Sequence, residues 1–199
     1  MGYVTRLIDG TTMYRVVMYA LFSVAFAAFT LSVAGLLTPG PIWLCASLAI
    51  IIAAASAAHY ACTFITKAPG NFESTIITAL ILFLILLPAT SIEEFTWLAL
   101  VAVLSVVGKY IIRYHYRHVF NPVALALVIA AAVGYYGVSW WVGSQYLWPV
   151  VLVAGSVVVY KTRRWPLALA YLGFSSVLAL ILFGGQEPAT MILRDQFTS

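Results

Sequence analysis

The sequence predicts an all-α fold, a polytopic membrane helix bundle of about seven transmembrane segments, some of them short or broken. Of its 199 residues, 64% are hydrophobic and 8% are charged, whereas soluble proteins have roughly 45–50% apolar and about 25% charged residues. The hydrophobic residues gather in long runs, and the charged residues fall in the short loops between them. We therefore expect residues 1–199 to form a single integral membrane domain.

The apolar runs define the expected helices in order along the chain. The first run, Met13 to Leu37, is longer than the ~7–15-residue core of a signal peptide and is expected to remain as a membrane anchor. Together with this anchor, six further runs give the seven expected segments: Ile42 to Ile65, Ser74 to Leu87, Phe95 to Ile112, Pro122 to Tyr136, Tyr146 to Tyr160 and Trp165 to Phe183.

The two cysteines fall near opposite ends of the second segment. At ~1.5 Å per helical residue, Cys45 and Cys62 lie about 25 Å apart, which is beyond the reach of a disulfide. The Cys and His residues around them do not make up a full set of metal ligands. We interpret both as small apolar packing residues.

The distribution of charge predicts the orientation of the chain. Alternating the loops between two sides places nine of the ten Lys and Arg residues on one side and only Arg194 on the other. Such an excess marks the cytoplasmic side, so we expect a protein of the cell (inner) membrane with a cytoplasmic N-terminus. Because orientation accounts for these cations, the net charge of +4 does not indicate nucleic-acid binding.

Two segments that begin with a polar cap are shorter than a full span. Ser74 to Leu87 and Pro122 to Tyr136 have about 14 and 15 residues, or ~21–23 Å, whereas the bilayer core needs about 20 residues. Paired short helices with capped N-termini are typical of ligand or ion sites within a membrane, although two ordinary helices would give the same pattern. The first of these segments follows a polar cap at Asn71 and is followed by a break at Pro88. The second has its polar cap at Asn121 and its break at Gly134.

Small residues form the run AAASAAHYA at Ala53 to Ala61. Small side chains let membrane helices approach closely, so we interpret the run as a packing face, with a flat bound ligand as the alternative. His59 belongs to this run. An ionisable residue at that depth is a candidate functional residue, although a neutral His hydrogen-bonded to a neighbouring helix is an equally good interpretation.

A basic junction joins the fourth and fifth segments. Asn121 is a favourable helix N-cap and Pro122 suits the first helical position, so the helix end there is expected to be electropositive. This junction is the best candidate for binding an anionic group, and the alternative is a topological anchor that contacts anionic lipid headgroups. The potentially cationic residues that precede the cap are Lys109, Arg113, His115, Arg117 and His118.

Several of these residues together resemble a known family. Asn71 and Ser74-Thr75 at the start of an apolar helix, Lys109 at the end of the next, and FNPVALALV at Phe120 to Val128 resemble the membrane subunits called D in Rnf complexes and B in the sodium-pumping NADH:quinone reductase. The resemblance covers roughly Asn71 to Phe183. It implies a helix bundle that carries electrons from cytoplasmic NADH or ferredoxin through membrane flavins. The candidate flavin-binding residues are Asn121, Pro122, Lys109, Arg113, His59, Ser74 and Thr75.

The chain departs from this family in two respects. Family members attach FMN to a Thr in a Gly-Ala-Thr-like motif of a long outward-facing region, but here only Gly134 to Trp148 separates the flanking segments. The chain contains no Gly-Ala-Thr, so we expect FMN or another flavin to be bound non-covalently. Family sequences also continue into further helices, so this chain is expected to be a reduced or truncated member.

Three classes of function stay open. The first is a membrane-embedded electron-transfer component whose partner is a cytoplasmic NAD(P)H- or ferredoxin-linked reductase domain or another electron-transport subunit. The second is a carrier or channel for a small polar molecule such as a flavin. The third is a haem-containing reductase that uses His59 with His115 or His118 as axial ligands. A hydrolase is not expected, because the membrane segments contain no Ser/His/Asp or paired-carboxylate arrangement.

Overall fold

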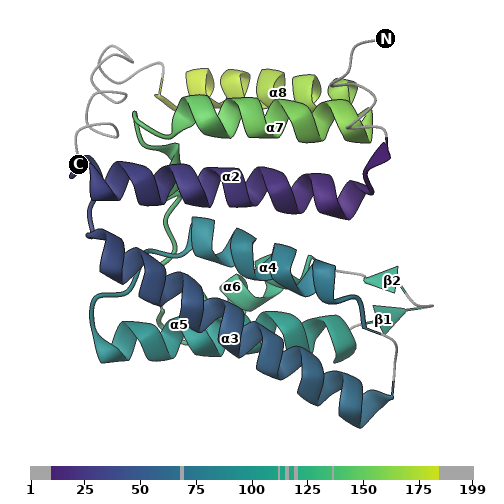
Figure 1. Ribbon diagram of the computed structural model, residues 1–199. Helices are drawn as coiled ribbons and strands as arrows, with labels where there is room; N and C mark the ends of the chain where they lie inside the picture. The colour runs from purple at the N-terminus through teal and green to yellow at the C-terminus, as the bar shows by residue number, and fades with distance from the viewer. Residues whose placement is uncertain are drawn as a thin grey trace.

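The computed structural model describes residues 10–67, 70–111, 113–114, 117–118, 121–135 and 137–183. Seven α-helices dominate this part of the chain and confirm the predicted all-α bundle (Figure 1). In chain order they are α2 (Met13–Val33), α3 (Pro41–Thr66), α4 (Phe72–Ile85), α5 (Ile92–Ile111), α6 (Pro122–Ala132), α7 (Trp148–Thr162) and α8 (Trp165–Phe183).

Three very short elements complete the described structure. The 3-10 helix η1 (Trp141–Gly143) precedes α7, and two strands of two residues each, β1 (Arg113–Tyr114) and β2 (Arg117–His118), follow α5. The strands pair antiparallel, with Arg113 opposite His118. The described residues of the basic junction beyond α5 therefore form two paired, antiparallel strands.

The helix ends differ from the predicted ones where glycine allows a turn. We expected the first helix to reach Leu37, but it ends at Val33 because Gly35 adopts a φ of 75°. We expected the fifth segment to reach Tyr136, but α6 ends at Ala132. Gly134 there has a φ of 97°, and the Tyr135 amide donates back to the Ala130 carbonyl over 2.9 Å. A left-handed glycine of this kind ends a helix without steric cost.

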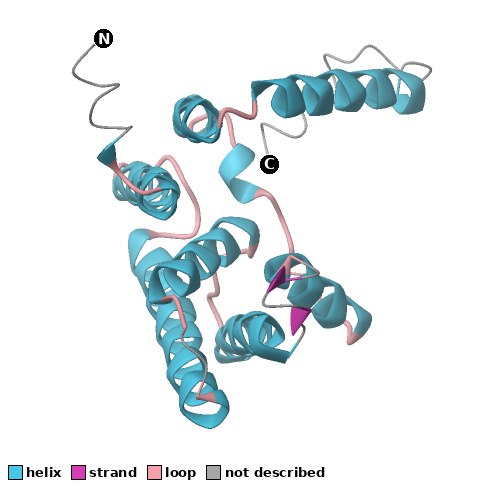
Figure 2. Cartoon of the chain, turned by 90° about the vertical axis from the view of Figure 1, so that its right-hand side faces the viewer, coloured by secondary structure: helices cyan, strands magenta, loops and turns pink. Residues whose placement is uncertain are grey.

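Four of the described helices, α2, α3, α5 and α8, are long and apolar enough to cross a membrane. The remaining three, α4, α6 and α7, are apolar but shorter. The chain is therefore a multi-pass membrane protein. Among the four spans α8 stands apart, because none of its membrane window is buried inside the protein, and Figure 2 shows it extending away from the other helices.

The core lies where α3, α4 and α5 pack together, and α2 lies between α4 and α7 (Figure 1). The face that α3 turns inward contains Ala55 and Ala58, and α5 places Ala102 in the same core. Small side chains allow membrane helices to approach closely. The packing interpretation of the Ala53 to Ala61 run is therefore supported by the structure.

The two short helices α4 and α6 are joined beyond their ends. Leu86, which follows α4, forms an antiparallel bridge with Val138, which follows α6. The Leu87 amide donates to the Gly137 carbonyl over 3.0 Å, and the Ser139 amide donates to the Ile85 carbonyl over 2.9 Å. Since lipid offers no hydrogen bonds, irregular backbone at membrane depth needs partners within the protein. Each broken helix supplies these partners to the other.

Side chains satisfy further backbone groups around the same break. The Trp141 Nε1 donates to the Phe83 carbonyl over 3.1 Å, and Ser47 Oγ of α3 accepts from the Ala89 amide over 2.9 Å. Aromatic residues between membrane segments commonly lie at the membrane interface, and from the sequence alone Trp141 is expected to be one of them. Instead, its ring lies against Phe83 and its N–H stabilises the end of α4.

Candidate functional site

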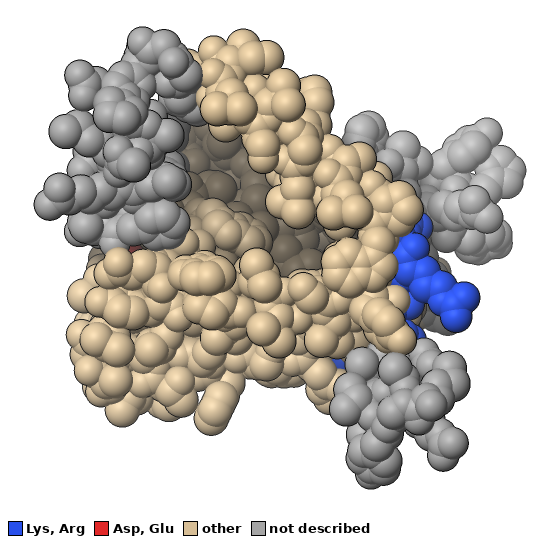
Figure 3. All heavy atoms as spheres, turned by 90° about the horizontal axis from the view of Figure 1, so that it is seen from above, with Lys and Arg blue, Asp and Glu red and all other residues tan. Residues whose placement is uncertain are grey.

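The described cations share one end of the bundle, which we call the cation-rich end. Helices α2, α4, α6 and α8 begin there, and α3, α5 and α7 end there, because successive helices alternate in direction (Figure 1). In the face seen in Figure 3, the visible Lys and Arg atoms gather at one end. The described cations of this end are Arg15, Lys67, Lys109, Arg113, Arg117, Lys161, Arg163 and Arg164.

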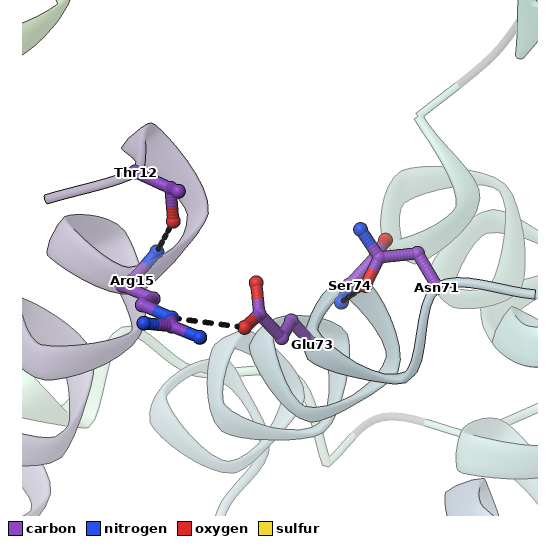
Figure 4. Close-up of polar contacts among 5 residues, drawn as sticks. All are labelled: Thr12, Arg15, Asn71, Glu73 and Ser74. Atoms are coloured by element: carbon purple, nitrogen blue, oxygen red, sulfur yellow. Dashed lines mark hydrogen bonds and ion pairs between the residues drawn. The ribbon is translucent and has the colours of Figure 1, made fainter.

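The start of α4 is fixed by its own cap and by an ion pair. Asn71 Oδ1 accepts from the Ser74 amide over 3.4 Å, as expected for an N-cap. Glu73, in the first turn, pairs with Arg15 of α2, with 3.2 Å between Arg15 Nε and Glu73 Oε1 (Figure 4). A carboxylate is favourable at this end of a helix. The ion pair thus connects the beginnings of α2 and α4.

The start of α6 has the predicted cap. Asn121 Oδ1 accepts from the Val123 amide over 3.1 Å, and Pro122 lies in the first turn. Helix α6 packs against α5 near this end, where a Cβ added to Gly108 would lie 3.6 Å from the Leu125 Cδ2. The second capped helix start is therefore placed next to the end of α5.

A buried polar cluster lies between α3, α4 and α5 at the same end. We define the His59–Lys109 cluster as His59, Ser74, Thr75, Lys109 and Tyr110. The Thr75 Oγ1 lies 2.9 Å from the His59 Nδ1, and the Tyr110 Oη lies 3.0 Å from the same nitrogen. Because a hydroxyl both donates and accepts, the ring is held in either tautomer. His59 and Thr75 are only 4% and 1% exposed.

Lys109 contributes a buried positive charge to this cluster. Its side chain is 6% exposed, and Nζ donates to the Ser74 carbonyl over 2.8 Å and to the Ser74 Oγ over 3.3 Å. The ammonium therefore lies beside the first turn of α4, where the helix amides already create a positive potential. Together they make this place favourable for an anionic group.

Two aromatic side chains that are themselves accessible lie against the buried His59 ring. The rings of Tyr60 and Phe72 are stacked 5.7 Å apart, and each lies 5.6 Å from the His59 ring. Both are accessible, at 62% for Tyr60 and 40% for Phe72. Gly70 closes the cluster from the loop before α4, because a Cβ there would lie 2.6 Å from the His59 Cε1. Two accessible aromatic rings thus border the buried cluster.

The structure brings four of the seven candidate residues together: His59, Ser74, Thr75 and Lys109. Asn121 and Pro122 lie at the separate start of α6, and the side chain of Arg113 is outside the described residues. Two members of the site were not predicted. Tyr110 and Gly70 were overlooked because their roles depend on contacts with distant residues: Tyr110 of α5 meets His59 of α3, and Gly70 lies against residues of both helices.

The described residues do not form a metal centre, since no group of three or more His, Cys, Asp or Glu among them could hold a metal ion. His115 and the side chain of His118 lie outside the described residues, so the haem hypothesis stays a prediction. What the cluster offers chemically is a buried cation, hydroxyl groups and a histidine. These groups suit hydrogen bonding to an anionic, polar molecule.

Fold and site together define a multi-pass membrane protein with paired broken helices and a buried polar cluster at one end. Comparison of the chain with protein-family models, with curated proteins and with solved structures gives no significant match. The resemblance to the Rnf and sodium-pumping subunits therefore rests on the sequence pattern alone.

Proposed function

We propose that this protein is a membrane-embedded electron-transfer component that holds a flavin non-covalently at the cation-rich end. The observation that carries the proposal is the buried ammonium of Lys109 at the start of α4, 2.8 Å from the Ser74 carbonyl. A phosphate group is favoured at such a place by both the ammonium and the helix amides. Lys109 also belongs to the pattern that resembles flavin-carrying membrane subunits.

The surroundings of Lys109 suit the remaining parts of a flavin. The accessible rings of Tyr60 and Phe72 offer aromatic contacts for the isoalloxazine ring. Thr75, Tyr110 and His59 supply hydrogen-bonding groups behind them. When bound, the flavin supplies the redox chemistry, and the chain binds and orients it.

A soluble partner would deliver the electrons at this end. The described cations there face the cytoplasm in the orientation that we propose, with the protein in the cell (inner) membrane and its N-terminus inside. Exposed cations such as Lys67, Arg163 and Arg164 attract an acidic protein surface and speed its encounter. A cytoplasmic NAD(P)H- or ferredoxin-linked reductase domain, or another electron-transport subunit, is the partner that fits this proposal.

A second function, a carrier for a small polar molecule, is favoured by the paired broken helices α4 and α6. Carriers place their sites at such interruptions near the middle of the membrane. In the described conformation, however, the core beneath the His59–Lys109 cluster is filled by Ile51, Leu82 and Val101, each at most 1% exposed. A carrier would have to open this apolar layer in each cycle, whereas an electron carrier would not.

The first prediction is that the purified full-length chain shows the absorption bands of a flavin and releases the flavin on denaturation. Release is expected because the chain has no Gly-Ala-Thr motif for covalent attachment. The chain has two Ala-Thr pairs, which end at Thr90 and Thr190. In-gel fluorescence of the denatured polypeptide that disappears in Thr90→Ala or Thr190→Ala would contradict non-covalent binding. A Soret band would favour haem, and flux of a polar solute into liposomes without any chromophore would favour the carrier.

The second prediction concerns orientation. In a variant with Cys45 and Cys62 changed to Ala, a Cys placed at Arg163 should resist an impermeant thiol reagent added to intact cells. A Cys placed at Glu93, in the first turn of α5 at the opposite end, is the matched control and should be labelled. The reverse labelling pattern would overturn the cytoplasmic placement of the cation-rich end and of the electron donor.

A further inference from the structure

An apolar groove runs between α2 and α7, away from the His59–Lys109 cluster. Its volume is about 670 Å³, within the range of roughly 300–1,000 Å³ that is usual for small-molecule sites. Small side chains, among them Ala20 and Ala154, leave this space between the two helices. The groove residues that the argument uses are Val16, Tyr19, Ala20, Val153, Ala154 and Val157.

Positive charge lies at one end of this groove. Thr11 lines the groove at the beginning of α2, which places that end of the groove at the cation-rich end. On α7, Lys161 follows the lining residue Val157 by one helical turn and so continues the same face. Arg163 and Arg164 are exposed in the turn between α7 and α8. In the face seen in Figure 3, the visible Lys and Arg atoms likewise lie at one end.

This combination matches the two parts of an anionic phospholipid. An acyl chain is flexible and apolar, and it fits a groove whose walls are mostly Val and Ala side chains. A negatively charged headgroup is attracted to clustered Lys and Arg at the membrane surface, more strongly than a zwitterionic one. The charge at the end of the groove therefore favours an anionic phospholipid over an entirely apolar occupant.

We propose that the α2–α7 groove is a binding site for an anionic phospholipid, with one acyl chain between the helices and the phosphate against Lys161, Arg163 and Arg164. The site does not depend on the proposed electron transfer. It would fasten α7, and through it the otherwise unburied α8, to the remainder of the bundle.

The test measures lipid binding to the full-length protein in detergent by native mass spectrometry. Phosphatidylglycerol and phosphatidylcholine with identical acyl chains are compared, and about tenfold tighter binding of phosphatidylglycerol is expected. Equal binding of the two lipids would overturn the proposal, because the headgroup would then not be recognised. Thermal unfolding in the same samples should show a higher Tm with the lipid that binds.

Variants test the groove and the charges separately. Val153→Phe fills the groove and should lose phosphatidylglycerol binding, whereas Leu152→Phe, a matched control on the next, exposed position outside the lining, should retain it. The triple change K161Q/R163Q/R164Q should abolish the roughly tenfold preference for phosphatidylglycerol over phosphatidylcholine. Lys67→Gln should leave this preference unchanged. Arg163 and Arg164 are exposed and Lys161 is half-buried, and a folded triple variant that keeps the preference would also overturn the proposal.

Discussion

Lys109→Met is expected to weaken flavin binding by about ten- to a hundredfold. The change removes a buried ammonium that donates to the Ser74 carbonyl and hydroxyl, and charge-assisted hydrogen bonds contribute roughly 1.5–3 kcal/mol each. Met preserves most of the side-chain volume, so packing between α4 and α5 is disturbed little. Flavin content and reduction by a cytoplasmic donor would be measured in the same preparation.

Two further variants show whether the charge or the packing is responsible. Ser74→Ala removes only the hydroxyl contact and leaves the carbonyl to Lys109, so its effect on flavin content should be smaller. Lys67→Met removes an exposed cation at the same end and should leave the flavin content unchanged. If Lys109→Met keeps its flavin while losing thermal stability, Lys109 is a structural residue and the flavin must bind elsewhere.

Gly70→Ala is expected to destabilise the protein by about 1–3 kcal/mol, the usual cost of adding atoms to a packed site. A Cβ at this position would lie 2.6 Å from the His59 Cε1 and 2.7 Å from the Thr63 Cγ2, and closer still to the Tyr110 hydroxyl. Since His59 is held by Thr75 and Tyr110, the hydrogen bonds of the cluster must be distorted. Flavin affinity should fall together with the Tm.

Gly155→Ala is the matched control for this substitution. Gly155 lies within α7, and a Cβ there would meet no atom within 4 Å. Alanine is favoured over glycine in a helix by roughly 0.5–1 kcal/mol, so this variant should be as stable as the wild type or more so. A Gly70→Ala protein with unchanged Tm and unchanged flavin content would show that Gly70 is not part of a tightly packed site.

The electron-transfer and carrier hypotheses require different behaviour of the two broken helices, α4 and α6. Joining α4 and α6 through Leu86 and Val138 fixes two broken helices against each other, which is what a rigid cofactor site needs. A carrier needs the same elements to separate, and the pairing beyond α4 and α6 opposes this movement. Covalently linking the two extended segments should therefore abolish transport but preserve electron transfer.

Local features of the fold could be predicted from the sequence because they depend on neighbouring residues. Asn71 and Asn121 both serve as the expected N-caps, and Trp165 to Phe183 was predicted with the same limits as α8. The break at Gly134 after α6 was expected and is present, whereas the early end of α2 was missed, because an apolar run does not reveal the left-handed conformation of Gly35.

The sequence by itself thus determined that this chain is an all-α, multi-pass membrane protein with two short, capped helices and its described cations at one end. Only the tertiary structure decided that His59 meets Thr75 and Tyr110, and that Lys109 turns inward to Ser74. In a soluble protein, an apolar stripe indicates which face of a helix is buried. In a membrane both faces are apolar, so the rotation of each helix, and hence the composition of the site, is set by packing between distant segments.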